Sequence, residues 1–446
     1  MPSANIILIM DKSTSMSVDQ YFIGVQTDCA TFVQIMKTND NLGVVTLSSS
    51  SQIIVPSSGN QMVPITGLPV QNQAVQAIVG TGMAGSTNMV DVISVSHGMI
   101  ASAATPRAIV LVSDGEWNTG GDPLPNLPTN VPIYTIALGP SAGLQTLQTI
   151  ANRTVGQGQG YYYAPNGWDL GTIYNNIVSQ ARVRSLTANA QPLLPNYTFQ
   201  TFPAILASGN SQGCFAVSWN NQAVIYTSGT PGGQQISVLL RDPNGNNVTP
   251  DTVAPGPGFV VLNVNNPIPG QWQVGTWTAN TGNLQTTVSA YDSNTQLTLD
   301  LQFDVTNLKV GTPVPFIAGI NYGGQPVKGA IVKAVAESPL ISIRQALTDH
   351  KNELAKLKIP KFHEQAPDEA MYRLKLLRER KLSKDDILQR STYPVNTNEN
   401  KSGEHHGNIS MTKVPGSHTL RVQVTGNSPI DGTLFSRVAQ LSVHLE

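Results

Sequence analysis

Five oxygen-bearing side chains stand next to apolar segments, where they could bind a metal ion. Asp11, Ser13 and Ser15 alternate directly after the first apolar run of the chain. Thr87 lies just before a predicted helix, and Asp114 directly follows a second apolar run. Carboxylates and hydroxyls are the ligands that hard divalent cations such as Mg²⁺ prefer. The pattern therefore predicts a metal site built from three separate loops.

The spacing of the first three residues suits a shared ligand, because a turn that leaves a strand can aim residues i, i+2 and i+4 at one point. Two other interpretations stay open. Ser and Thr are common helix N-caps and Asp-Gly is a common turn, so the five residues could be structural. A complete site could also bind metal only to stiffen its loops. Lys12, inside the pattern, could lower metal affinity or point to solvent.

The elements that must position these residues lie in residues 1–184, where apolar strands alternate with helical patterns. This alternation is typical of a Rossmann-like doubly wound sheet, mainly parallel, with helices on both faces. Ligands of such a sheet bind beyond the carboxyl ends of its strands, where Asp11 and Asp114 fall. The predicted strands are 4–10, 42–47, 52–55, 107–113, 131–138 and 161–164, and the predicted helices are 21–37, 72–79, 88–101, 143–151 and 168–181.

The D-x-S-x-S pattern at 11–15, together with Thr87 and Asp114, resembles the metal-ion-dependent adhesion site of von Willebrand factor type A domains. All five positions of the family's motif are filled, and the resemblance covers roughly residues 1–184. It implies that the serines and the threonine ligate the metal directly, while the aspartates often act through water. It also implies that one coordination position is left for an acidic side chain of a partner, with no base or nucleophile beside it.

The remainder of the chain is predicted to be all-β. After about residue 190, short alternating strands are separated by turn residues such as D-P-N-G at 242–245. We expect a β-sandwich domain over 190–294 and an immunoglobulin-like β-sandwich over 295–446. The chain is therefore predicted to be multidomain, with α/β followed by all-β architecture.

A charged helical insertion at about 341–390 interrupts the second sandwich. It holds 20 of the chain's 53 charged residues, and a second helix is expected to start at Pro367. The favoured interpretation is a solvated helical hairpin packed on the sandwich, followed by a flexible stretch that contains His405 and His406. Self-association through this basic, amphipathic block, or contact with an anionic surface or a partner's groove, are the alternatives.

Composition excludes several classes of protein. The net charge of −1 gives no attraction to nucleic acid, and no apolar stretch is long enough for a membrane span. A strand begins at about residue 4, so no signal peptide is predicted. The expected location is cytoplasmic by default, with surface or non-classical secretion open. Cys29 and Cys214 fall in different predicted domains and are expected to be free, buried thiols.

Several enzymatic motifs are missing from the sequence. It contains no H-E-x-x-H, no Walker loop and no cysteine pair. The run GTGMAG at 80–85 satisfies G-x-G-x-x-G, but it follows a helical segment and not a strand, so a dinucleotide site is not expected. We therefore predict that the chain is not an enzyme.

The primary hypothesis is a metal-dependent protein-binding or adhesion module. In it, Mg²⁺ (or Mn²⁺ or Ca²⁺) at Asp11, Ser13, Ser15, Thr87 and Asp114 captures an acidic residue of a protein partner. One alternative is a self-assembling structural scaffold in which the metal only rigidifies loops. Another is an adaptor subunit of an ATP-driven complex, although no acidic linker or ATPase region supports it.

Overall fold

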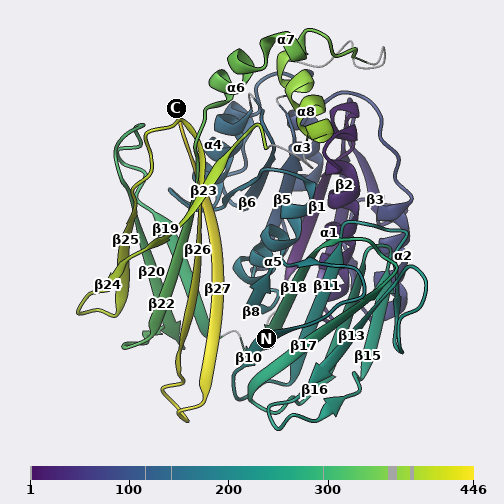
Figure 1. Cartoon of the computed structure of the whole chain (residues 1–446), viewed down its shortest axis with the longest axis vertical. Helices are drawn as coiled ribbons and strands as arrows, with labels where there is room; N and C mark the ends of the chain where they lie inside the picture. The colour runs from purple at the N-terminus through teal and green to yellow at the C-terminus, as the bar shows by residue number, and fades with distance from the viewer. Residues whose placement is uncertain (1–2, 116, 142, 295, 360–368, 382–385) are drawn as a thin grey trace.

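The first sheet carries the predicted metal site at the carboxyl ends of its strands. The computed structural model describes residues 3–115, 117–141, 143–294, 296–359, 369–381 and 386–446 (Figure 1). The strand order is β3-β2-β1-β5-β6-β7, in which β3 is antiparallel and the others are parallel. The strands are β1 (Asn5–Asp11), β2 (Asn41–Leu47), β3 (Gln52–Val55), β4 (Val63–Pro64, paired with β2), β5 (Arg107–Ser113), β6 (Ile133–Leu138) and β7 (Tyr161–Ala164).

Alternate residues of β1 face opposite sides of this sheet, and helices cover both sides. Ile6, Leu8 and Met10 belong to the core that includes α1, α2 and α5. Ile7 and Ile9 belong to the core that includes α3 and α4. The helices are α1 (Tyr21–Ile35), α2 (Leu68–Val79), α3 (Met89–Ile100), α4 (Leu144–Thr154) and α5 (Leu170–Gln180). Helices on both faces of a mainly parallel sheet confirm the predicted doubly wound α/β fold. This covering on both faces explains why the central strands are apolar runs.

Two mainly antiparallel sheets follow and pack face to face, with β12 paired to β13 in parallel. Their orders are β10-β17-β13-β12 and β15-β16-β11-β18-β8. Trp272 of one sheet packs on Phe215 of the other, with ring centroids 5.5 Å apart, inside a core shared by both sheets. The strands are β8 (Ser185–Ala190), β9 (Leu193–Leu194), β10 (Phe199–Leu206), β11 (Gln212–Trp219), β12 (Ile225–Thr227), β13 (Gln235–Arg241), β14 (Asn247–Val248), β15 (Thr252–Gly256), β16 (Phe259–Asn265), β17 (Gly270–Ala279) and β18 (Leu284–Asp292).

A second pair of antiparallel sheets closes the chain, with orders β19-β20-β25-β24 and β23-β22-β26-β27. The predicted flexible stretch before β26 is wrong, because it contains strands β23 to β25. The side chain of His405 is buried and that of His406 is exposed, as alternation along β25 requires. The strands are β19 (Leu297–Phe303), β20 (Val314–Tyr322), β21 (Gln325–Pro326), β22 (Ile331–Pro339), β23 (Arg390–Val395), β24 (Thr397–Glu399), β25 (Glu404–Ile409), β26 (Gly416–Asn427) and β27 (Leu434–Leu445).

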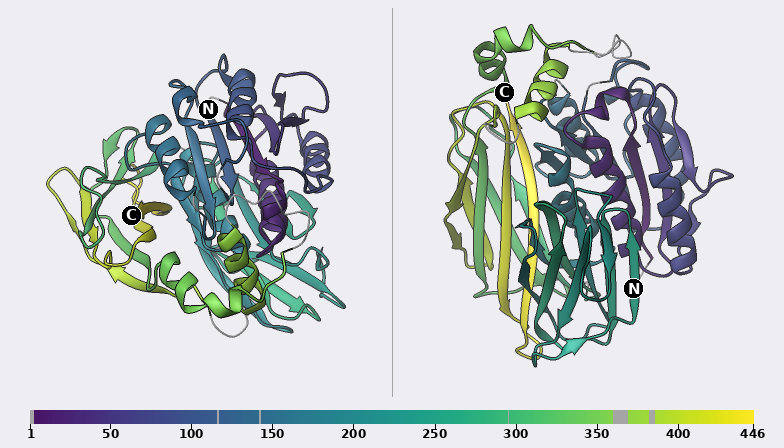
Figure 2. Two further views of the ribbon diagram at one scale, coloured as in Figure 1. Left: turned by 90° about the horizontal axis from the view of Figure 1, so that it is seen from above. Right: turned by 45° about the vertical axis from the view of Figure 1, so that its right-hand side comes forward.

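The three groups of sheets lie against one another (Figure 2). The hydroxyl of Ser442 on β27 accepts a hydrogen bond of 3.1 Å from the backbone N–H of Tyr163 on β7. On the other side, α1 packs against β11 and β16 of the first sandwich. The proposed division into domains 1–184, 190–294 and 295–446 stays a prediction, and β8 already begins at Ser185.

The described residues of the charged insertion form the helices α6 (Ile343–Asp349), α7 (Lys351–Leu354) and α8 (Glu369–Lys381). Its buried apolar residues form a small core of their own, made of Ala346, Leu354, Leu357, Leu374, Leu377, Ile387 and Leu388. The prediction that it packs on the sandwich is wrong for α8, which lies at the carboxyl ends of β1 and β5 (Figure 1). The predicted helix start at Pro367 lies outside the described residues.

Two further expectations can be compared with the structure. Cys29 and Cys214 are both buried and free, as predicted. Within the described ranges, no helix has the length and apolar character needed to cross a lipid bilayer.

Candidate metal centre

The centre is built around Asp11, the last residue of β1. Its side chain is fully buried. Its Oδ1 accepts a 2.8 Å hydrogen bond from the backbone N–H of Ser13, and its Oδ2 accepts one of 2.7 Å from the hydroxyl of Ser113. Ser113 ends β5, which pairs with β1 in parallel register. The carboxylate is therefore fixed between two adjacent strand ends.

The two serines of the D-x-S-x-S pattern connect Asp11 to Asp114. The backbone turns after β1 into the short 3₁₀ helix η1 (Thr14–Ser17). The Oγ atoms of Ser13 and Ser15 are 3.1 Å apart, and the Ser15 hydroxyl donates a 2.8 Å hydrogen bond to Oδ1 of Asp114. Four of the five predicted residues thus belong to one hydrogen-bonded cluster, although Asp11 and Asp114 are 103 positions apart in the sequence.

Thr87 is brought to the same place by backbone hydrogen bonds. Its loop, between α2 and α3, accepts a 3.2 Å bond at Gly85 from the N–H of Thr14. Its own N–H donates to the side-chain oxygen of Asn118 at 2.8 Å, in the loop after Asp114. Thr87 is buried, and its hydroxyl makes no hydrogen bond to the other four residues, all of which are described. Three loops therefore meet, with Thr87 attached through its backbone.

Burial and the nearby carboxylate of Asp114 both disfavour the ionised form of Asp11, and a bound cation would offset this cost. The pKa of Asp11 is raised to about 7, first by burial and then by the negative charge of Asp114, against the hydrogen bonds from Ser13 and Ser113. Two buried carboxylates beside hydroxyls are a donor set that hard divalent cations accept. The residues present therefore fit a divalent cation, and Asp11, Ser13, Ser15, Thr87 and Asp114 are the ones that would hold it.

A residue that sequence reasoning missed supplies positive charge to this cluster. The ammonium of Lys375, on α8, donates to Oδ2 of Asp114 at 2.8 Å and to the backbone oxygen of Asp114 at 2.7 Å. Lys375 is only 4% exposed, and its Nζ lies 5.6 Å from the ring centroid of Tyr21. The two residues are 261 positions apart. The available signal was a basic, amphipathic helix, which does not identify its target.

Two neighbours of Lys375 on α8 contact the same end of the sheet. The guanidinium of Arg378 lies 3.9 Å from the carboxylate of Asp19 and donates to the backbone oxygen of Pro165, just after β7. Burial raises the pKa of Asp19 to about 6, and the charge of Arg378 opposes this shift. The hydroxyl of Tyr372 is 3.5 Å from that of Ser17. These contacts hold α8 over the strand ends.

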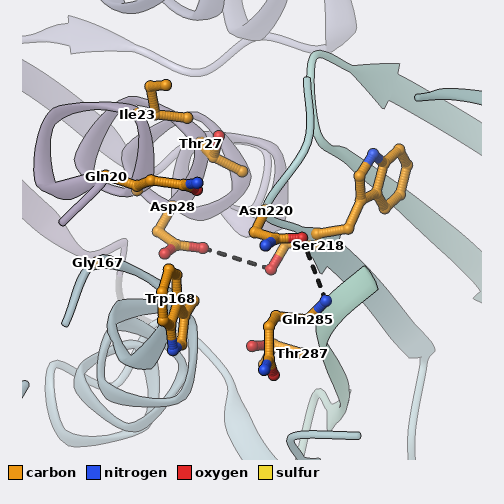
Figure 3. A pocket seen from close by; sticks show the side chains of 12 residues that line it. Gln20, Ile23, Thr27, Asp28, Gly167, Trp168, Ser218, Asn220, Gln285 and Thr287 are labelled. Carbon is orange, nitrogen blue, oxygen red and sulfur yellow. Dashed lines mark hydrogen bonds between the residues drawn. The ribbon is translucent and has the colours of Figure 1, made fainter. Parts of the chain in front are cut away.

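A second polar pocket lies elsewhere, between α1 and the first sandwich (Figure 3). Its volume of about 30 Å³ leaves room for a few water molecules at most. Asp28 lines it and accepts a 3.4 Å hydrogen bond from Ser218, while burial raises the pKa of Asp28 to about 8. Asp28 therefore links α1 to the first sandwich, in a cavity too small for a substrate.

The GTGMAG run at 80–85 is confirmed as part of a loop between two helices, since α2 ends at Val79 and α3 begins at Met89. It therefore lacks the preceding strand that a dinucleotide site requires. In the described part of the chain, no group of three or more His, Cys, Asp and Glu side chains could hold a metal. A centre here depends on hydroxyl ligands in addition to two carboxylates.

Comparison with solved structures gives matches of low identity. One is the von Willebrand factor type A protein from Catenulispora acidiphila (11% identity, 73% of this chain, 64% of that chain, TM-score 0.38). Another is the ArnB paralog VWA2 from Sulfolobus acidocaldarius (12%, 73%, 64%, TM-score 0.31). A third is the manganese-loaded TRAP protein from Plasmodium vivax (15%, 46%, 88%, TM-score 0.30). The chain thus spans about two thirds of the length of the first two, and similarity this low carries no functional argument.

The sequence itself gives the family. A search of curated proteins finds no match. Residues 5–176, however, match the family model of the von Willebrand factor type A domain, over the region that forms the first sheet and its helices. Residues 5–176 therefore form a von Willebrand factor type A domain, and antiparallel β-sheets follow it.

Proposed function

We propose that this chain is a protein-binding module whose type A domain captures an acidic residue of a partner through a divalent cation, Mg²⁺ or Mn²⁺. The observation that carries the proposal is the hydrogen-bonded cluster of Asp11, Ser13, Ser15 and Asp114, with Thr87 attached by its backbone. When bound, the cation would supply a Lewis-acidic position to which a partner carboxylate can bind.

Each residue of the cluster has a definite task in this proposal. Ser113 and the N–H of Ser13 orient the carboxylate of Asp11, so that little conformational freedom is lost when a ligand binds. The Ser15 hydroxyl orients Asp114 in the same way. Asn118 fixes the backbone of Thr87. The result is a rigid oxygen-lined surface at the strand ends, which suits binding of a partner more than bond cleavage.

Non-enzymatic binding follows from the same donor set. The five residues offer carboxylates and hydroxyls, and general acid–base chemistry needs a group positioned to exchange a proton with a substrate. Asp11, whose pKa is shifted, accepts two hydrogen bonds and is fully buried. Its protonation therefore concerns the charge of the site and not a proton transfer to substrate.

The first test is Mn²⁺ binding, measured by electron paramagnetic resonance on the full chain. Asp11→Ala should weaken binding by at least about tenfold, because it removes one of two carboxylates while the loops stay in place. Asp122→Ala is the matched control, since it removes an exposed carboxylate from the loop after β5. Equal Mn²⁺ affinity in both variants would refute the site. Circular dichroism checks that each variant is folded.

A second candidate function has one observation in its favour. The salt bridge from Lys375 already neutralises part of the charge at Asp114, so the cluster is held together by the protein alone. In that case the strand-end face is a permanent structural joint of a multidomain scaffold. Such a joint needs no metal, and it would leave Mn²⁺ affinity at background in every variant of the chain.

A further inference from the structure

Helix α8 covers the face of the type A domain where a partner would bind. Tyr372, Lys375 and Arg378 are spaced by three residues, which places them on one side of the helix. They contact Ser17 after β1, Asp114 after β5 and Pro165 after β7. In an open parallel sheet, this is the region where ligands bind. A segment of the chain itself therefore occupies the ligand face.

The central contact of α8 is made by a cation. Asp114 divides its carboxylate between the two sides of the site, with Oδ1 bound to the Ser15 hydroxyl and Oδ2 bound to the ammonium of Lys375. A single positive charge beside two buried carboxylates leaves the site one charge short of neutral. A divalent cation would supply the missing charge, and it would repel the ammonium at the same carboxylate.

The opposite side of α8 packs against the other helices of the insertion. Leu374 and Leu377 pack into the small apolar core that α6, α7 and α8 share with Ile387 and Leu388. The side toward the domain carries Lys375 and Arg378, and its apolar contacts come from Tyr372, which is buried, and Leu376, which is partly buried. The contact between α8 and the type A domain can therefore separate without exposing the insertion's own core. Interfaces that are not large and hydrophobic allow the parts that they join to move relative to each other.

We propose that α8 is an intramolecular ligand of the strand-end face, in which the ammonium of Lys375 replaces the divalent cation at Asp114. Metal and partner then bind only after α8 has left, so the two occupants exclude each other. The inference rests on the proposed function and adds its regulation. Its thermodynamic consequence is a metal affinity that is reduced by the fraction of molecules in which α8 is docked.

The test measures Mn²⁺ affinity by isothermal titration calorimetry on the full chain. Lys375→Met removes the charge and keeps an unbranched stem beside Tyr21, so packing is largely retained. Arg380→Met is the matched control, because Arg380 is an exposed cation on the same helix. We expect Lys375→Met to bind Mn²⁺ at least about tenfold more tightly than the wild type and the control. Adding Asp11→Ala to Lys375→Met should abolish this gain.

The outcomes separate the two claims. If the wild type and Lys375→Met bind Mn²⁺ with the same affinity, the inference is overturned and the proposed function stands. If neither binds Mn²⁺ although both are folded, the proposed function is overturned, and the inference with it. Should Lys375→Met fail to fold, hydrogen exchange of the wild type decides. Saturating Mg²⁺ should then increase amide exchange in residues 369–381, and unchanged exchange would overturn the inference.

Discussion

Two of the buried ion pairs that join distant parts of this chain are built differently. Arg437 on β27 binds Asp292 on β18 with both terminal nitrogens, at 3.0 and 3.1 Å, and its Nε donates to the backbone oxygen of Leu297 at 2.9 Å. Lys375 reaches a single carboxylate oxygen of Asp114 and one backbone oxygen. Planar, two-point binding suits a permanent joint, whereas an ammonium is a point charge that another cation can replace.

The difference shows what each pair is for. Arg437 links the two sandwiches, and its carboxylate partner Asp292 also accepts a hydrogen bond of 3.2 Å from the backbone N–H of Asn294. Lys375 binds a carboxylate that is already connected to Ser15, Ser13 and Asp11. We infer that the first pair fixes the architecture, while the second occupies a site that other ligands could use.

The largest effect is expected for the permanent joint. Arg437→Ala leaves Asp292 buried without its cation and should lower the free energy of unfolding by about 3–5 kcal/mol. Urea unfolding followed by circular dichroism measures this. Arg241→Ala, at an exposed arginine, is the control and should change stability by less than about 0.5 kcal/mol. Similar losses in the two variants would contradict the contrast drawn between the pairs.

Asp28 is a buried carboxyl of a third kind, because no cation among the described residues pairs with it. It accepts a hydrogen bond from the hydroxyl of Ser218. Burial raises its pKa from 3.8 to about 8, so the folded state keeps a proton that the unfolded state has lost between those values. Stability should therefore fall as pH rises from about 4 to 8.

Asp28→Asn removes this ionisation and should stabilise the protein at pH 8 by about 2–4 kcal/mol, with little change at pH 4. Urea unfolding at both pH values measures it. Asp300→Asn, at an exposed carboxyl, serves as the control. A stability difference that is independent of pH would show that Asp28 is ionised in the folded protein.

The replaceable pair should respond to metal. In EDTA, Lys375→Met should lose about 1–3 kcal/mol of stability, because it leaves a buried carboxylate without its donor. Saturating Mg²⁺ should restore much of this loss in the variant and change the wild type less. Thermal unfolding with and without Mg²⁺ measures both. A loss that Mg²⁺ cannot restore would place Lys375 in the same class as Arg437.

The smallest effect is expected at Lys12, the lysine inside the D-x-S-x-S pattern. Its backbone N–H donates to Leu47 and its carbonyl accepts from Ala84, and these bonds survive a change of side chain. Its side chain is partly exposed, so solvent screens its charge. Lys12→Met should therefore change Mn²⁺ affinity by less than about threefold. A larger gain would mean that Lys12, and not Lys375, controls access to the site.

Local pattern was enough to predict the type A domain and its doubly wound sheet, whereas the metal site stays a prediction. Strands such as β1 and β5 are continuous apolar runs because helices cover both faces of the sheet, and Asp11 and Asp114 stand at or next to their ends. Parallel pairing of β1 with β5 brings four of the five predicted residues close together. The metal itself, the domain boundaries and the acidic partner residue stay predictions.

The docking of α8 could not be predicted from sequence. The contact between Lys375 and Asp114 spans 261 positions and depends on how the insertion leaves β22 and returns at β23. The strands between the insertion and β26 were missed for another reason. Their Asn, Gly and His content is typical of loops, and only the partner strands β20 and β22 show that these segments pair.

The central claim is that oxygen atoms from three loops hold a divalent cation at the end of β1. Anomalous diffraction from crystals of Lys375→Met soaked in MnCl₂ tests it most directly. We expect a manganese peak within coordination distance of Ser13, Ser15 and Thr87, next to Asp11 and Asp114. A peak located elsewhere, or none in a crystal where these residues keep their places, would contradict it.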